Sequence, residues 1–420
     1  MKKILSNWFV FLIFLLTLIP INSSCEMEWH DTKSTYIREQ KAWTSLYYID
    51  VDTAKPLWNI IFNLDVLEHD FIDEIASAEN LNVLVLQDKI RGPAVLYYID
   101  GQHNKIILEE LGEVNMGNPQ TLIDSINYTK ENFPANRYQL CFSGHANAWY
   151  GVCPDDTSRG DSLNPHELKQ AFMETSGIDL LCFIGCCKMG SLEVIYELKD
   201  YCDVYIASED DGYGPHWYGM IDDMCDLINS NPDLPTVKIG EQIIKFIKNN
   251  PNEYRNELTI SAIRTDKING LFKSFNELCK YLYNNDALYQ NVKSARNITK
   301  EFTFIQDSYL IDFYDFIEKY LAIETNSTVL QILNSIKKNF SQTIIAECHG
   351  QNQNGSHGFS IFYSTNDMIS LYPTYNLDFT DDSYWDELLD DHKEKFNGFF
   401  TSKNVFKSFS LHNIEFTYRG

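Results

Sequence analysis

The sequence has little positive charge. Its 34 lysines and arginines stand against 59 aspartates and glutamates, so the 420 residues carry a net charge of −25. Proteins whose main partner is a nucleic-acid backbone or an anionic membrane surface carry the opposite balance. We therefore expect no nucleic-acid partner and interpret the acidity as a solvated surface. Attraction of basic substrates is an alternative that the composition leaves open.

Several patterns that define other protein classes are also missing. Beyond the first residues there is no second apolar run of the ~20 residues that a membrane span needs, and there is no internal repeat. The 10 cysteines form neither a regular disulfide framework nor paired CxxC zinc motifs. Cys182, Cys186 and Cys187 lie too close together to join distant segments, so we expect at least one free thiol there.

The first residues have the pattern of an export signal. Two lysines precede an apolar run over residues 8–19, which Pro20 and small residues follow. A run of about 12 apolar residues is too short for a membrane span. We therefore expect residues 1–24 to be a signal peptide, removed from a protein that is secreted or held at the cell surface. An uncleaved anchor, or a lipid on Cys25, is the alternative.

The first half of the chain alternates apolar runs with helical patterns. Continuous apolar runs predict buried strands, short runs predict further strands, and capping residues open helices. The strands are expected at 44–49, 81–86, 94–99, 138–143, 178–184 and 204–207, and the helices at 60–75, from Asn118-Pro119 and from the Asn164–Glu167 capping box. This rhythm predicts an α/β fold, with a mostly parallel sheet covered by helices on both faces.

The regular alternation of strands and helices ends near residue 251. Helical patterns follow at 271–282 and 329–336, with strand-like runs at 343–346, 358–363 and 413–418. We interpret residues 40–250 as the core and residues 251–420 as a C-terminal α+β subdomain packed on it.

Two of the expected strand ends carry chemically active residues. His145 follows the strand at 138–143, and Cys186 and Cys187 follow the strand at 178–184. Sites in parallel sheets gather at the carboxyl ends of strands. A helix that begins near Ser191 and a nearby imidazole would both favour a thiolate. Spacing alone equally allows buried small residues beside a core histidine, and it does not choose between the two cysteines.

The residues around the cysteines resemble a known family. Residues 185–190 (GCCKMG) and 193–198 (EVIYEL) resemble the nucleophile segment of the clostripain-type cysteine peptidases, which are relatives of the gingipain, legumain and caspase group. The resemblance continues at 113–117, 143–145 and 384–389. It implies a caspase-like α/β/α sandwich and a cysteine endopeptidase acting on peptides or proteins.

The resemblance also assigns roles within the site. Cys187 occupies the nucleophile position, and Cys186 replaces a small residue beside it. His145 is implied as the base of a Cys–His dyad, with His166 or His216 as substitutes if it is not. The backbone N–H groups of Ala146 and Cys187 would hold the oxyanion.

Two residues depart from the family pattern. Ala146 stands where the family has glycine, so a Cβ could crowd the oxyanion pocket or demand another backbone angle. Gly185 stands where the family has an aspartate that binds a basic substrate side chain in the specificity pocket. Glu209, Asp210 or Asp211 could supply a substitute charge, although the three could also simply solvate a loop.

Residues 154–164 (PDDTSRGDSLN) separate the implied base from the implied nucleophile. This polar segment is expected to be exposed and mobile. Relatives are cut in this interval, so we expect cleavage after Arg159, with an uncut loop as the alternative.

The resemblance implies no obligatory cofactor, although some relatives use calcium. Asp155, Asp156 and Asp161 could contribute ligands, but their spacing specifies no site.

Two other functions compete with peptidase activity. A catalytically silent relative that binds peptides or surfaces would be compatible with Ala146 and Gly185. A thiol-redox role for Cys186 and Cys187 is disfavoured, because adjacent bridged cysteines form a strained ring and no CxxC is present.

Overall fold

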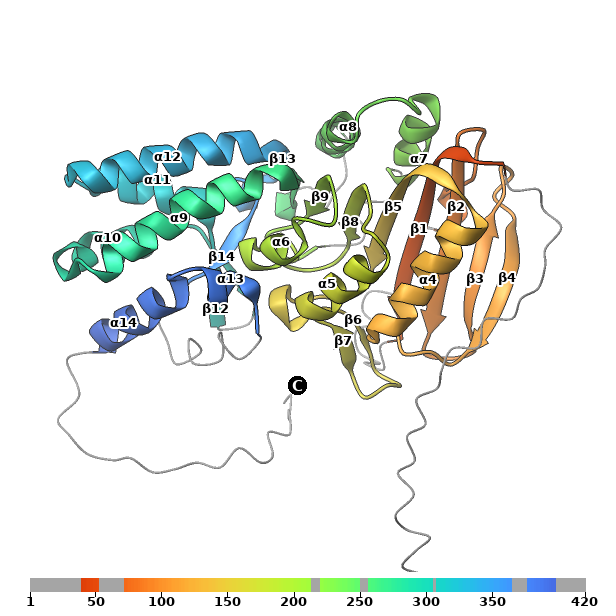
Figure 1. The fold of residues 1–420 in the computed structure, drawn as a ribbon, viewed down its shortest axis with the longest axis horizontal. Helices are drawn as coiled ribbons and strands as arrows, with labels where there is room; N and C mark the ends of the chain where they lie inside the picture. Colours follow the sequence, from red (N-terminus) through yellow and green to blue (C-terminus); the bar gives the residue numbers. More distant parts are fainter. Residues whose placement is uncertain are drawn as a thin grey trace, which may run out of the picture.

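The protein is built around one large mixed sheet (Figure 1). The computed structural model describes residues 39–52, 72–212, 220–249, 256–304, 307–364 and 376–397. Within them a nine-stranded sheet has the order β13-β10-β9-β8-β5-β1-β2-β3-β4.

The centre of this sheet is parallel, as the apolar runs predicted. The neighbouring pairs β9/β8, β8/β5, β5/β1 and β1/β2 are all parallel. These strands have long buried stretches, and β8 (LLCFI) is buried at every position. They span β1 (Lys41–Val51), β2 (Leu81–Lys89), β5 (Ala135–Ser143), β8 (Leu180–Ile184) and β9 (Val204–Ala207).

Antiparallel strands extend the sheet on both sides. On one side are β3 (Ala94–Ile99) and β4 (Lys105–Gly112), and on the other are β10 (Thr259–Arg264) and β13 (Ile344–His349). The sequence pattern missed β4 because most of its side chains are partly or fully exposed. Consequently β3 has a neighbour on each side, and β4 forms this end of the sheet.

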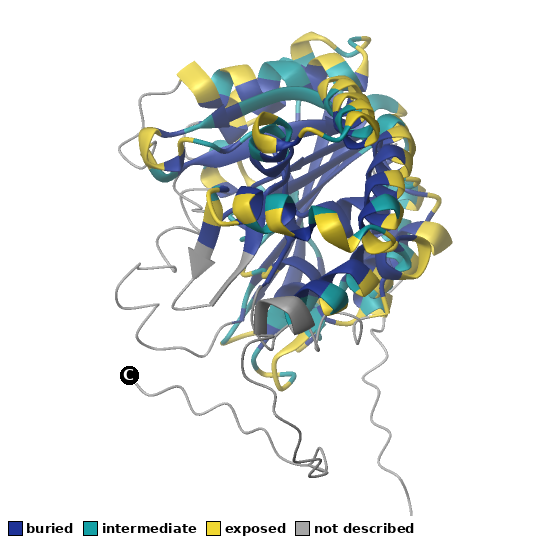
Figure 2. Ribbon diagram, turned by 90° about the vertical axis from the view of Figure 1, so that its left-hand side faces the viewer, coloured by how far each residue is buried: buried dark blue, intermediate teal, exposed yellow. Residues whose placement is uncertain are grey.

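Helices cover both faces of the sheet. One core contains α4 (Pro119–Asn132), α5 (Pro165–Glu174) and α6 (Leu192–Leu198), and a second core contains α7 (Ile221–Ser230) and α8 (Thr236–Asn249). The strands are buried between these layers, whereas the helices turn exposed residues outward (Figure 2). Asn118 caps α4 and Asn164 forms a capping box with Glu167, as predicted. The caspase-like α/β/α architecture is therefore observed.

The later part of the chain forms a helical layer beside β9, β10 and β13 (Figure 1). Its helices are α9 (Ile268–Tyr283), α10 (Tyr289–Arg296), α11 (Phe313–Ile323), α12 (Ser327–Thr343), α13 (Asp378–Asp382) and α14 (Trp385–Asn397). A small sheet contains β11 (Glu301–Phe304), β12 (Asp307–Asp312) and β14 (Ser360–Phe362). Short 3₁₀ helices lie at Ala148–Tyr150, Thr265–Lys267, Asp286–Leu288 and Gln351–Gln353.

The central sheet runs across the boundary expected between residues 250 and 251. Both β10 and β13 follow that point in the sequence, yet they pair with each other and with β9. The later region therefore contributes strands to the core sheet itself. Whether the two regions act as separate domains stays a prediction.

Some predictions concern residues outside the described part of the chain. These are the signal peptide at 1–24, Cys25, His216, the strand at 413–418 and most of the helix at 60–75. Among the helices that the structure describes, none combines the length and hydropathy needed to cross a membrane.

Candidate active site

The parallel pairing of β5 with β8 brings the two predicted residues to one edge of the sheet. Ser143 lies opposite Ile184 at the end of this pairing. His145 follows two residues after Ser143, and Cys187 follows three residues after Ile184. Both therefore lie just beyond the carboxyl ends of adjacent strands. His145 is exposed and Cys187 is partly exposed.

The two adjacent cysteines have different surroundings. Cys186 is fully buried, and its Sγ lies 3.7 Å from the carbonyl oxygen of Phe142 and 3.6 Å from that of Ile184. Cys187 is the one described cysteine that is not fully buried, and all the described cysteines are free thiols. Accessibility therefore supports the assignment of the nucleophile to Cys187.

A loop after β9 packs directly against the cysteine segment. The Gly190 N–H donates to the carbonyl oxygen of Ser208 at 2.7 Å, and the Lys188 N–H donates to that of Asp210 at 2.9 Å. Gly212 approaches so closely that a Cβ there would lie 2.7 Å from the Cys186 carbonyl oxygen. We call residues 208–212 the covering loop.

The covering loop changes the acidity of the nucleophile. Burial, and then the negative charge of Asp211, raise the pKa of the Cys187 thiol to about 11. Lys188 and the Gly212 N–H favour the thiolate, but they do not offset the increase in pKa that burial and Asp211 cause. The helix expected near Ser191 does exist as α6, which begins at Leu192, yet the pKa of the Cys187 thiol is raised. The expectation that this helix makes the thiol acidic is therefore wrong for this conformation.

The three acidic residues of the covering loop have separate partners. The Asp211 carboxylate forms an ion pair with the buried Lys188 side chain. Asp210 accepts a hydrogen bond of 2.8 Å from the Gln353 side chain. Glu209 accepts one of 3.2 Å from the Gly358 N–H. Of the three, Asp211 acts most strongly on the charge of Cys187. A role for any of them in substrate selection stays a prediction.

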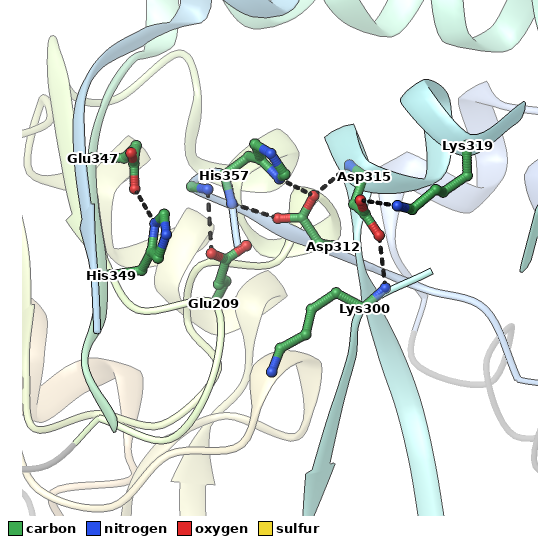
Figure 3. A network of polar contacts seen from close by, with 9 residues as sticks. Glu209, Lys300, Asp312, Asp315, Lys319, Glu347, His349 and His357 are labelled. Atoms are coloured by element: carbon green, nitrogen blue, oxygen red, sulfur yellow. Dashed lines mark hydrogen bonds and ion pairs between the residues drawn. The ribbon is translucent and has the colours of Figure 1, made fainter. Parts of the chain in front are cut away.

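Glu209 anchors the covering loop in a polar network of the later region (Figure 3). Burial, and then the neighbouring Asp312 carboxylate, hold the pKa of the Glu209 carboxyl well above its ordinary value. Asp312 in turn accepts from the His357 N–H at 2.7 Å, and its Oδ1 lies 3.0 Å from the His357 ring Nδ1. The Glu209 carboxylate thus belongs to this network.

The local backbone decides whether alanine can stand at position 146. Its two neighbours take part in a short antiparallel bridge. The His145 carbonyl oxygen accepts from the Cys153 N–H at 3.0 Å, and the Asn147 N–H donates to the Gly151 carbonyl oxygen at 3.0 Å. This bridge does not use the Ala146 N–H. Ala146 is also absent from the described non-glycine residues with positive φ, so its conformation does not require glycine. Gly185, by contrast, has φ +72°.

The segment around Arg159 is more ordered than the sequence suggested. It forms a hairpin of β6 (Val152–Asp155) and β7 (Asp161–Leu163) rather than a loop without structure. Asp155 is fully buried, and its carboxylate accepts hydrogen bonds from the backbone N–H groups of Met116 and Ser158. Arg159 lies exposed at the tip.

Sequence reasoning missed two features of this edge. One is Lys188, whose pairing with Asp211 depends on the packing of the covering loop. The other is an acidic cluster of Asp52, Asp88, Glu113 and Asp155. Of these four, the sequence pattern pointed only to Asp155, as a possible calcium ligand. The one signal in the sequence was that Asp52 and Asp88 lie near the ends of apolar strands.

We predict that alkylation of Cys187 by iodoacetamide accelerates about tenfold per pH unit from pH 7 to pH 10, because its thiolate fraction grows in that proportion below the pKa. Asp211→Asn should lower the thiol pKa and accelerate labelling at pH 8, whereas Lys188→Met should slow it. Peptide mapping by mass spectrometry gives the rate at each cysteine. A labelling rate that is already constant above pH 7, or two variants that shift together, would contradict the assigned electrostatics.

The comparisons with known proteins agree on one family. The model of the clostripain family matches residues 62–392. Clostripain of Hathewaya histolytica is 26% identical over 238 residues, which cover 46% of this chain and 44% of that protein. The chain thus matches less than half the length of this curated relative.

Solved structures share the fold. A secreted C11 cysteine protease from Bacteroides thetaiotaomicron, in complex with an irreversible peptide inhibitor, gives a TM-score of 0.62 at 18% identity, over 81% of this chain and 98% of that one. An inactive zymogen C11 protease from Parabacteroides distasonis gives a TM-score of 0.61 at 20% identity, over 83% of this chain and 99% of that one. With the family model matching most of its length, the chain belongs to the clostripain family.

Proposed function

We propose that this protein is a secreted cysteine endopeptidase in which Cys187 and His145 form the catalytic dyad. The observation that carries the proposal is the position of both residues just beyond the carboxyl ends of the paired strands β5 and β8, in a chain of the clostripain family. The implied substrate is a peptide or protein. Export is supported by the signal pattern at residues 1–24 and by the B. thetaiotaomicron relative, which is described as secreted.

The reaction follows from the two side chains. His145 removes the proton of the Cys187 thiol as sulfur attacks the scissile carbonyl carbon, and it then gives that proton to the leaving amine. The N–H groups of Ala146 and Cys187 would hold the oxyanion. Water, deprotonated by the same imidazole, then hydrolyses the acyl-enzyme. Because burial raises the pKa of the Cys187 thiol to about 11, the resting thiol keeps its proton, and the base must act during the attack.

The first prediction from this proposal separates the two cysteines. Cys187→Ala should abolish peptide hydrolysis, whereas Cys186→Ala should retain it, because the Cys186 thiol lies against backbone carbonyls inside the fold. His145→Ala should lower the rate by about 10²–10⁴, the usual share of general acid–base catalysis. Initial rates on a fluorogenic peptide measure all three.

Two outcomes of that experiment would point elsewhere. Turnover retained in Cys187→Ala would overturn the nucleophile. Full activity in His145→Ala would transfer the role of base to another histidine, such as His166. A folded wild type without turnover, whatever the peptide, would favour the silent, peptide-binding relative, which the high thiol pKa and Gly185 also favour.

The specificity pocket is expected to select weakly for arginine. Gly185 offers no charge, Asp211 is already paired with Lys188, and Glu209 is directed into the network of Figure 3. Gly185→Asp should therefore raise the preference for Arg over Leu before the cut by about tenfold or more, the effect of a charge-assisted pair. Aspartate and asparagine both tolerate positive φ, so Gly185→Asn is the matched uncharged control.

The measurement is kcat/KM on paired peptides with Arg, Lys, Gln or Leu before the scissile bond. Strict arginine preference in the wild type would show that a carboxylate of the covering loop already fills the role. An equal change in Gly185→Asp and Gly185→Asn would exclude charge as the cause.

We also propose that the chain is cut after Arg159 to give two associated chains. Arg159 is exposed at the hairpin tip with φ +69°, between the predicted base and nucleophile. The covering loop, which packs against the cysteine segment, and the zymogen form described for the P. distasonis relative support a latent precursor. Intact mass of the wild type should show two fragments, with a single chain in Cys187→Ala. A wild type that is fully active and uncut would overturn this proposal. Cleavage of both the wild type and Cys187→Ala would mean that another peptidase makes the cut.

A further inference from the structure

Two buried carboxyl groups from distant segments meet where the covering loop contacts the later region (Figure 3). Glu209 belongs to the covering loop, whereas Asp312 ends β12 and caps α11. Both side chains are buried. The Asp312 carboxyl lies within hydrogen-bonding reach of the Glu209 carboxyl. Two carboxylates repel each other strongly where water is excluded, so this contact needs a proton.

The surrounding hydrogen bonds show which carboxyl holds that proton. Asp312 accepts from the Asp315 and His357 backbone N–H groups, and its Oδ1 lies 3.0 Å from the His357 ring Nδ1. Glu209 accepts from the Gly358 N–H through Oε1, whereas its Oε2 has no N–H or O–H donor among the described residues. Donors favour the charged form of a carboxyl group, so the proton belongs to Glu209, which then donates it to Asp312 in a hydrogen bond.

The groups around this contact are mostly acidic. After burial and Asp312, the charge of Glu347 on β13 also raises the pKa of the Glu209 carboxyl. Within the described part of the chain, His357 is the one basic side chain paired with Asp312. Burial lowers the pKa of the His357 ring, but its contact with Asp312 outweighs this and raises it. The remaining titratable groups on the segments packed here are Lys188, Asp210, Asp211, Asp315, Lys319 and His349.

Glu209 stands between the two residues of the covering loop that hold the cysteine segment. Before it, the Ser208 carbonyl oxygen accepts from the Gly190 N–H at 2.7 Å. After it, the Asp210 carbonyl oxygen accepts from the Lys188 N–H at 2.9 Å. A displacement of Glu209 would therefore reach the backbone that follows the proposed nucleophile through one peptide unit on either side.

We propose that Glu209 is a positioning residue of the active site, and that the proton it shares with Asp312 holds the covering loop against the later region. Loss of this proton places two negative charges together in a buried site, so the loop separates from Asp312. After burial, the charge of Asp211 on this loop raises the pKa of the Cys187 thiol, so separation of the loop makes the thiol more reactive. The link to catalysis rests on the proposed peptidase function, but the contact and its tests do not.

The first test is the unfolding midpoint as a function of pH, measured on the full-length chain carrying Cys187→Ala to exclude self-digestion. Because folding raises the pKa of the Glu209 carboxyl from 4.5, stability falls as the pH rises from this value towards the raised pKa. Glu209→Gln has no such proton to lose and still donates a hydrogen bond. Its midpoint should lie close to that of the parent at about pH 5 and exceed it by about 2 °C or more at about pH 9.

Two further variants separate the shared proton from a general effect of charge. Asp312→Asn removes the neighbouring negative charge, so its midpoint should fall less steeply with pH than that of the parent. This variant also decides the question if Glu209→Gln does not fold. Glu347→Gln is the matched control, because the partly exposed Glu347 carboxylate contacts the His349 ring at 2.9 Å. It should leave most of the pH dependence in place.

The second test measures whether the contact acts on Cys187. Parent and Glu209→Gln both carry His145→Ala here, so that the imidazole adds nothing to the pH profile. The rate of Cys187 alkylation by iodoacetamide in the variant, divided by that in the parent, should be close to unity at about pH 6 and fall severalfold by about pH 9. Thiolate formation itself cancels in this ratio. A merely structural role would give a ratio that does not change with pH.

Each outcome decides the proposal. A midpoint difference between Glu209→Gln and the parent that is the same at every pH would overturn the shared proton, as would an Asp312→Asn variant as steep as the parent. The expected midpoints with a constant labelling ratio would overturn the positioning role. A folded wild type without peptide turnover would contradict the proposed function, and both tests would still decide on Glu209.

Discussion

The parallel pairing of β5 with β8 is the constraint on which the site depends. Five consecutive residue pairs, from Gln139 with Leu180 to Ser143 with Ile184, fix where each strand ends. Because strand side chains alternate between faces, a slip of one residue would exchange the inward and outward sets. It would bring the buried Cys186 to the place of Cys187. Because β8 is apolar and buried on both faces, its paired hydrogen bonds with β5, rather than a choice of face, set the position of the thiol several residues after them.

The later region of the chain takes part in the same architecture. The buried Glu193 carboxylate of α6 accepts from the Phe362 N–H at 2.8 Å, and Glu197 accepts from the Phe379 N–H at 3.0 Å. The Gly190 carbonyl oxygen accepts from the Ser360 N–H at 2.9 Å. The glutamates of the EVIYEL segment, which helped to identify the family, therefore attach the helix after the nucleophile to the C-terminal segments. They are structural residues rather than reactive ones.

Local signals in the sequence predicted much of this fold. Continuous apolar runs located β2 and β8, and the Asn118 and Asn164 caps located α4 and α5. Features that depend on contacts between distant segments were not predictable. The exposed pattern of β4 hid an edge strand. The buried Asp155 carboxylate accepts from the Met116 N–H, which lies far away in the sequence, so its burial could not be read from its own segment. Likewise, the resemblance assigned the nucleophile to Cys187, but the raised pKa of its thiol comes from burial and then from Asp211 of the covering loop, which spacing cannot place.

The β6–β7 hairpin has a consequence for the charge of this edge. The Gly160 N–H donates to the Asp155 carbonyl oxygen at 2.7 Å. A cut after Arg159 would turn that neutral amide nitrogen into a new α-amino group, which is largely protonated near neutral pH. The nitrogen that is hydrogen-bonded to Asp155, a member of the acidic cluster, would thus gain a positive charge. Peptide-bond cleavage at the tip would then change local electrostatics as well as chain connectivity, and the chain would carry its own counter-ion.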